Sequence, residues 1–186
     1  MGLMFFKRVT LMTNEEFIEF ITPYEQMIYG IAYRYVRNKE DAKDVAQESV
    51  VKMYRDLAGG KPEAGKACRA WVAKVTVNTA IDELRKRRNR PAVSLDMAQP
   101  LDKGMGPLET AVANESLENI FTAINKLPEE YKRIIILRDV EGLSYDELTE
   151  ALDAKPGTVK SRLSRARAML AKYYEIGMEQ KQAANV

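Results

Sequence analysis

The stretch EGLSYDELTEALDAKPGTVKSRLSRARAML, which begins at Glu141, carries the boundary signals that decide the fold. Ser144 followed three residues later by Glu147 matches a capping box, in which the two side chains satisfy backbone N–H groups at a helix start. The pattern predicts a short helix over 145–152 and, after a tight turn, a longer helix over 156–174 that opens on proline. Two helices joined by such a turn, the second one basic, are typical of a helix-turn-helix.

At about 100° per residue, the second of these helices has two distinct faces. Its apolar side chains form one narrow stripe, which predicts a face packed in the core: Val159, Leu163, Ala166 and Leu170. The opposite face carries Thr158, Ser161, Ser164 and Arg165, flanked by the cations Lys160, Arg162 and Arg167. Small side chains allow a close approach to base edges, an arginine can donate twice to guanine, and flanking cations suit phosphates. Because residues 155–172 hold six Lys or Arg and no Asp or Glu, DNA binding is favoured over the alternative of a solvated amphipathic helix.

Most of the remaining chain has apolar residues at three- and four-residue steps, which indicates helices rather than strands. The segment 91–110 breaks the pattern with three prolines and two glycines. Proline disfavours helix in the residue before it, so this segment is interpreted as a flexible linker. The predicted fold is therefore all-α, with one small helical domain over 1–90, the linker over 91–110 and the helix-turn-helix domain over 111–186.

The first domain is expected to present an acidic stripe beside an apolar one. Asn38 is placed to cap a helix that continues to Leu57, with acidic residues in its first turn. Acidic and amide side chains lie along this helix at Asp41, Asp44, Gln47 and Glu48. A soluble helix of mixed charge is the alternative, since lysines and an arginine lie on it as well. A loop over 58–66 then precedes a helix that begins near Cys68 and ends in the basic run 85–90.

Composition restricts the classes of function. The 186 residues carry a net charge of only +2, so the local basic stretches are more informative than the total. The chain has no histidine, a single cysteine, no Walker A string and no nucleophile elbow, so we expect no enzymatic activity, no cofactor and no bound metal. No apolar run reaches the ~20 residues of a membrane span, and no secretory leader pattern is present. A cytoplasmic protein without membrane insertion is expected.

Two strings match a known family. EGLSYDEL at 141–148 and GTVKSRLSRAR at 157–167 closely resemble the C-terminal domain of extracytoplasmic-function (ECF) sigma factors, a group of the sigma-70 family. The resemblance implies that this domain reads the upstream promoter element near minus thirty-five through Lys160, Ser161, Ser164 and Arg165, with a further contact from Arg138. The family usually has glycine at Asp153 and a hydroxyl residue at Lys155. Aspartate tolerates a left-handed turn, whereas loss of a hydroxyl cap costs about 1 kcal/mol.

The first domain resembles the same family. DAKDVAQE at 41–48 looks like the helix that docks on a coiled coil of the largest RNA polymerase subunit, which implies core binding by Asp41, Asp44, Gln47 and Glu48. VNTAIDELR at 77–85 resembles the part that reads the downstream element near minus ten, where a loop captures a base flipped from the melted strand. The resemblance thus implies DNA contacts from this helix and from the basic run that ends it: Asn78, Arg85, Lys86, Arg87, Arg88 and Arg90.

The expected function is that of a transcription initiation factor that binds RNA polymerase core enzyme and directs it to specific promoters. Its DNA partners are the double-stranded upstream element and the melted downstream element. Because an anti-sigma factor usually holds members of this family inactive, such a partner is expected here too. The alternative is a stand-alone helix-turn-helix regulator, which would need a dimer or a second DNA-binding copy but no polymerase.

Overall fold

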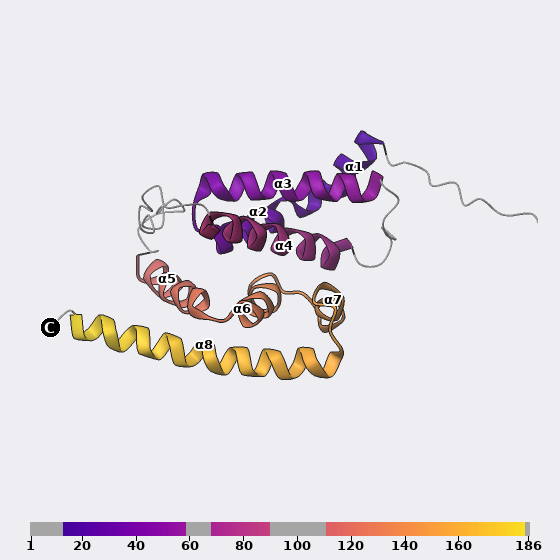
Figure 1. Ribbon diagram of the computed structural model, residues 1–186. Coiled ribbons are helices and arrows are strands. Elements are labelled where there is room, and N and C mark those ends of the chain that lie inside the picture. The colour runs from indigo at the N-terminus through magenta and orange to yellow at the C-terminus, as the bar shows by residue number, and fades with distance from the viewer. Residues whose placement is uncertain (1–12, 59–67, 90–110, 185–186) are drawn as a thin grey trace, which may run out of the picture.

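The computed structural model describes residues 13–58, 68–89 and 111–184, and its regular structure is helical throughout these ranges (Figure 1). The all-α prediction is therefore confirmed. The predicted linker at 91–110 lies outside the described residues, as do Arg90 and all but the first residue of the predicted loop. None of the helices in the described ranges is long and apolar enough to cross a bilayer.

The helices before residue 90 are α1 (Asn14–Ile21), the short 3₁₀ helix η1 (Thr22–Tyr24), α2 (Glu25–Val36), α3 (Lys39–Ala58) and α4 (Cys68–Asn89). The start of α3 follows from two adjacent residues. Arg37 adopts a left-handed conformation, with φ of 58°, which ends α2. Asn38 Oδ1 then accepts hydrogen bonds from the N–H groups of Glu40 and Asp41 at 2.9 and 3.0 Å, which confirms the predicted cap.

The helices after residue 110 are α5 (Ala111–Lys126), α6 (Glu129–Ile135), the π-helical turn η3 (Ile136–Val140), α7 (Tyr145–Ala151) and α8 (Pro156–Ala184). The predicted capping box before α7 is present, since Glu147 N donates to Ser144 Oγ and Ser144 N donates to Glu147 Oε2, at 3.2 and 2.7 Å. Asp153 has a φ of 46°, so aspartate does take the left-handed position of the turn. Helix α8 extends ten residues beyond the predicted end at 174, and it contacts α5 in this extension, where Asn119 Nδ2 donates to Met178 Sδ at 3.3 Å.

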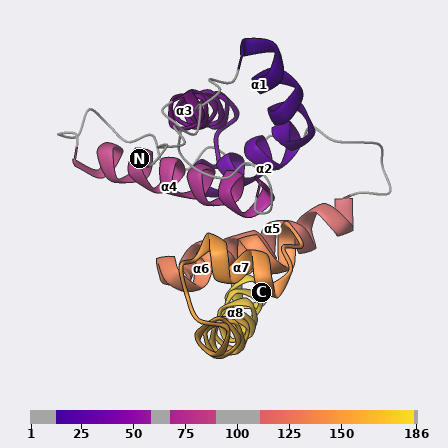
Figure 2. The same cartoon turned by 90° about the vertical axis from the view of Figure 1, so that its right-hand side faces the viewer.

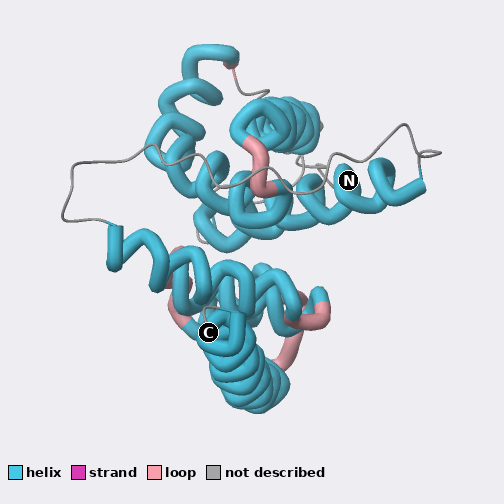
Figure 3. Tube along the Cα trace, turned by 90° about the vertical axis from the view of Figure 1, so that its left-hand side faces the viewer, coloured by secondary structure: helices cyan, strands magenta, loops and turns pink. Residues whose placement is uncertain are grey.

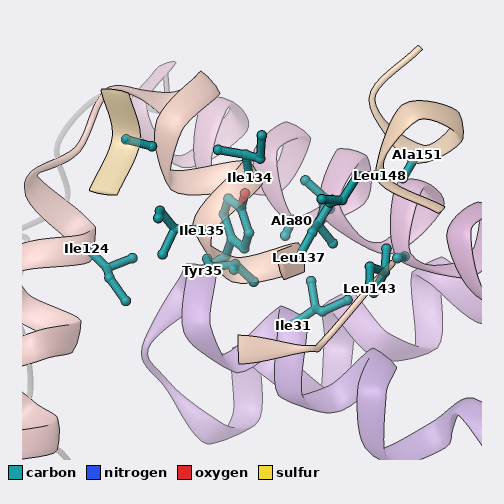
Figure 4. Packing of buried hydrophobic residues seen from close by; sticks show 14 of the residues in the cluster. Ile31, Tyr35, Ala80, Ile124, Ile134, Ile135, Leu137, Leu143, Leu148 and Ala151 are labelled. Carbon is teal, nitrogen blue, oxygen red and sulfur yellow. The ribbon is translucent and has the colours of Figure 1, made fainter. Parts of the chain in front are cut away.

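The two groups of helices lie against each other rather than apart (Figure 2). In Figure 2, α4 lies next to α6 and α7, and α4 contacts α7 directly. The view from the opposite side shows the same two groups of helices, one against the other (Figure 3). One buried apolar cluster includes residues from both groups, among them Ile31, Tyr35 and Ala80 on one side and Ile135, Leu137 and Leu148 on the other (Figure 4). A second, smaller cluster lies entirely within α1 to α4 and includes Phe17, Ile28 and Met53.

Loss of the Asn38 cap of α3 should lower the stability of the protein. Asn38→Ala removes the oxygen that accepts two helix N–H groups and should lower the free energy of unfolding by about 1 kcal/mol. Asn38→Gly should lower it by only a few tenths of a kcal/mol, because glycine is tolerated at this position. Urea unfolding followed by circular dichroism measures both values. Equal losses in the two variants would contradict the role assigned to the cap.

Candidate nucleic-acid interface

Helix α8 presents the face that the sequence predicts for base contact. Thr158, Ser161, Ser164 and Arg165 are exposed, as is the flanking Lys160. The side chains of Val159, Leu163 and Ala166 on the other side are at most 2% exposed, so the rotational setting of the helix is fixed by burial. Ser161 Oγ donates to the Thr158 carbonyl at 3.1 Å, which leaves its oxygen available as an acceptor.

Arginines border this face, and neighbouring carboxylates position two of them. Arg167 binds Asp139 of η3 with two hydrogen bonds of 3.0 and 2.5 Å, and these bonds raise the pKa of Arg167. Arg162 Nε lies 3.4 Å from Glu130 Oε2. Arg138 donates to the Leu143 carbonyl, and its guanidinium carbon lies 4.9 Å from the centre of the Tyr145 ring. The predicted upstream set therefore surrounds the start of α8, with three of its cations held in defined positions.

The predicted acidic stripe on α3 is only partly exposed. Asp44 and Gln47 are exposed, whereas Asp41 pairs with Arg87 of α4. Glu48 Oε1 lies 3.2 Å from Lys52 Nζ and 3.7 Å from Lys86 Nζ. Two residues predicted to hold phosphates, Lys86 and Arg87, thus pair with two residues predicted to bind polymerase. The structure brings the two predicted sets together along the α3–α4 contact.

Arg87 donates hydrogen bonds to the carboxylates of Asp41 and Glu83, and these bonds raise the pKa of Arg87. Arg88 is exposed, and Arg85 lies 3.5 Å from Asp82. Asn78 is exposed on α4, but its Oδ1 accepts a 2.6 Å hydrogen bond from Arg133 of α6. The bond between Asn78 and Arg133 joins the two groups of helices.

An apolar cavity of about 410 Å³ opens beside the acidic stripe, between α2 and α3. It is lined by Glu25, Ile28, Ala46, Gln47, Val50 and Val51. Gln47 therefore belongs both to the predicted polymerase-binding set and to the wall of this cavity. Within the described ranges, no group of three or more Cys, Asp or Glu is arranged to hold a metal ion.

Sequence reasoning missed a set of charged residues that connect the two groups of helices. Arg34 of α2 pairs with Glu141 at 2.6 Å, and Arg69 of α4 donates to the carbonyls of Glu141 and Gly142. Arg34 and Glu141 are 107 positions apart, so no local pattern joins them. The one signal in the sequence is Arg34 itself, a cation that lies between Ile31 and Tyr35, both of which the structure buries.

Comparisons with known proteins identify the family. Residues 20–90 match the family described as Sigma-70 region 2, and residues 117–170 match Sigma-70, region 4. The ECF RNA polymerase sigma-E factor of Haemophilus influenzae is 33% identical over 173 residues, which cover 88% of this chain and 90% of that protein. The chain belongs to the ECF sigma factors. It is thus a promoter-specific initiation factor that binds RNA polymerase.

Other comparisons agree with this assignment. The ECF sigma factor is 37% identical to the RNA polymerase sigma factor SigV of Bacillus subtilis over 147 residues, or 78% of this chain and 83% of that protein. The sigma factor RpoE of Bartonella quintana shares its fold, with a TM-score of 0.66 and 22% identity over 87% of this chain and 98% of that one. Sigma factors are transcription initiation factors. The alternative of a stand-alone regulator has no support among these relatives.

Proposed function

We propose that this ECF sigma factor reads the upstream promoter element with the exposed face of α8. The observation that carries the proposal is that α8 buries Val159, Leu163 and Ala166 on one side, with Leu170 partly buried, and exposes hydroxyl and cationic side chains on the other. Ser161, Ser164 and Arg165 would face base edges in the major groove, with Thr158 at the same surface. Lys160, Arg162, Arg167 and Arg138 would hold phosphates on either side.

The core enzyme would dock on the acidic stripe of α3. Asp44 and Gln47 are exposed for direct contact, and Asp41 and Glu48 extend the stripe along the same helix. A negative stripe facing a basic partner speeds encounter and fixes register. The apolar cavity beside Gln47 could receive an apolar side chain of the partner, which would add burial to the electrostatic attraction.

The downstream element would contact α4. Asn78 and Arg88 are exposed there, and Arg85, Lys86, Arg87 and Arg90 complete the basic set. Lys86 and Arg87 would exchange the carboxylates of Glu48 and Asp41 for DNA phosphates. This exchange would be easier once the polymerase binds those carboxylates, so the two sites would assist each other.

The units that carry these sites are residues 1–90 and 111–186, joined by the linker 91–110. An anti-sigma factor is an expected partner, since the related RpoE of Bartonella quintana was solved in complex with the anti-sigma factor NepR. The protein would act by binding alone, without catalysis or a cofactor. It would do so in the cytoplasm, where polymerase and DNA are present.

Run-off transcription with purified bacterial core enzyme tests this function directly. Templates drawn from a random promoter library should yield transcripts when core and this protein are combined, and not when either is omitted. Selected templates should share two elements at a constant spacing. Transcripts that lack a common upstream element would contradict the assignment of α8.

Substitution of the central arginine of α8 should affect promoter binding alone. Arg165→Ala should weaken holoenzyme binding to the selected promoter by about 10- to 100-fold, because one arginine–base contact contributes roughly 1–3 kcal/mol. Core binding should stay unchanged. Lys172→Ala removes an exposed cation two turns further along the same helix and should change promoter affinity less than about twofold. Gel-shift titration measures both, and equal losses would show that charge rather than position matters.

Reversal of charge on the acidic stripe should affect polymerase binding alone. Asp44→Arg places a cation against a basic partner and should weaken core binding at least about tenfold, by repulsion. Glu19→Arg makes the same charge change on α1, outside the stripe, and serves as the matched control. Fluorescence anisotropy of labelled protein with core enzyme gives both affinities. Unchanged core affinity in Asp44→Arg would remove α3 from the docking surface.

A further inference from the structure

Exposed apolar side chains gather along α1 and α3, beside the apolar cavity between α2 and α3. Val51 of α3 is 44% exposed and lines the cavity. Tyr54 lies one turn further along α3, is also exposed, and donates its hydroxyl to Asn14 Oδ1 at 2.7 Å. Ile18 follows Asn14 by one turn on the same side of α1 and is 61% exposed. Apolar side chains gathered in this way mark a surface that binds another apolar element.

The groove formed by this cavity and its exposed margin has an apolar floor with room for large side chains. Ile28, Ala46 and Val50 line the cavity, and Ile28 is buried. The cavity volume of about 410 Å³ lies within the range of roughly 300–1,000 Å³ that is typical of sites that bury a small molecule. One or two large apolar side chains therefore fit, and their burial is favourable because it removes apolar surface from water.

The segment of this chain that precedes α1 has the composition that such a groove requires. Residues 1–12 lie outside the described residues, and their sequence is MGLMFFKRVTLM. Eight of these twelve residues are large and apolar, two are cations, and none is acidic. A segment with so many apolar side chains favours burial against an apolar surface over exposure to water.

The chain enters α1 at the margin of the groove. Thr13 caps α1, and the neighbouring Asn14 is bonded to Tyr54 near the end of α3 (Figure 1). Gln47, which lines the cavity, precedes Tyr54 by seven residues. This separation is about 10 Å along the helix axis. An extended chain advances roughly 3.3 Å per residue, so about three residues cover that distance, and residues 3–12 are long enough to run past the whole cavity.

Charge favours the same segment as the occupant. Helix α1 carries three glutamates and no cation. Glu25 lines the cavity, and the exposed Asp44 lies one turn before Gln47 on α3. The groove therefore has carboxylates at its margin, and these complement the two charges of the segment, Lys7 and Arg8.

We propose that residues 3–12 bind in the groove of their own chain, with apolar side chains in the cavity, and that polymerase displaces them when it docks on α3. The displacement rests on the proposed function, because Gln47 belongs both to the cavity wall and to the predicted docking set. A tethered segment has a high effective concentration, so even a weak intrinsic affinity keeps the groove filled. A second copy of the chain would supply the same segment only at its much lower bulk concentration. Core enzyme binds the molecules whose groove is empty, so occupancy lowers its apparent affinity.

Photo-cross-linking from the groove tests the occupant directly and needs no polymerase. Benzoylphenylalanine replaces Val51 in the full chain, and the matched control places it at Ile120, an exposed apolar residue of α5. The product should join position 51 to residues 1–12 of the same chain, at a yield at least about tenfold above that from position 120. The yield should not depend on protein concentration. Products that join two chains, or the lack of a cross-link within residues 1–12, would overturn the inference.

Two variants show which property of the segment matters. The first replaces large apolar residues by serine: Phe5→Ser, Phe6→Ser, Val9→Ser and Leu11→Ser. In this apolar variant the cross-link from position 51 should fall at least about tenfold, because the burial is lost. The second variant, Lys7→Ser with Arg8→Ser, should lower the yield only about twofold, because salt screens exposed charges. Circular dichroism verifies that both variants keep their helices. Equal cross-linking in the wild type and the apolar variant would overturn the inference.

Displacement by polymerase is measured with the apolar variant and core enzyme. Its apparent core affinity should rise about tenfold, which corresponds to a groove that is about nine tenths filled in the wild type. Unchanged core affinity, in a preparation where Asp44→Arg does weaken core binding, would overturn the displacement. If Asp44→Arg leaves core affinity unchanged while the cross-link to residues 1–12 forms, the proposed docking on α3 fails and the binding of the segment stands.

Discussion

The burial of apolar side chains between α4 and the segment from α6 to α7 is the contact on which the other features depend. The same apolar cluster includes Tyr35 of α2 together with Ile135 and Leu137. The contact also brings the backbone of Glu141 and Gly142 within reach of Arg69 of α4. An apolar contact has little direction, so it can hold two helical units together but cannot by itself set their register. The ion pairs around Glu141 supply that direction. Removing charge from this cluster would thus change the register of the two groups of helices. Removing apolar area from the interface would instead weaken their affinity for each other.

The basic surfaces of α4 and α8 differ in where the carboxylates that pair with their cations lie. The cations of α4 face carboxylates of α3, so Lys86 and Arg87 are already neutralised within the protein. The part of α8 before residue 172 has no acidic residue of its own, and the arginines that border its exposed face pair with carboxylates of α6 and η3. Surface pairs of this kind are weak and readily exchanged in water. The protein can therefore keep a net charge near zero while still offering a local positive surface to DNA.

Local signals predicted most of the helix boundaries, because each depends on residues close in sequence. The capping box at Ser144 and the cap at Asn38 both lie where the sequence indicates, and the stripe through Val159 and Leu163 is buried as expected. The partners of Arg34 and Arg133 could not be predicted in this way, because they lie 107 and 55 positions away. The contact between α8 and α5 beyond residue 174 was not predicted for the same reason, since Met178 and its partner Asn119 lie 59 positions apart. Periodicity defines a buried face, but it does not say which element covers that face.

The π-helical turn η3 has a consequence for comparing this protein with its relatives. A π turn holds about one residue more than an α turn, so it advances the helix phase by roughly 100°. Arg138 and Asp139 lie within this turn, and Asp139 orients Arg167. A relative that lacks the extra residue would carry the same two side chains on a different side of the helix. Aligned letters at these two columns would then describe different surfaces, and promoter preference could diverge through a single-residue deletion without any change in the recognition helix.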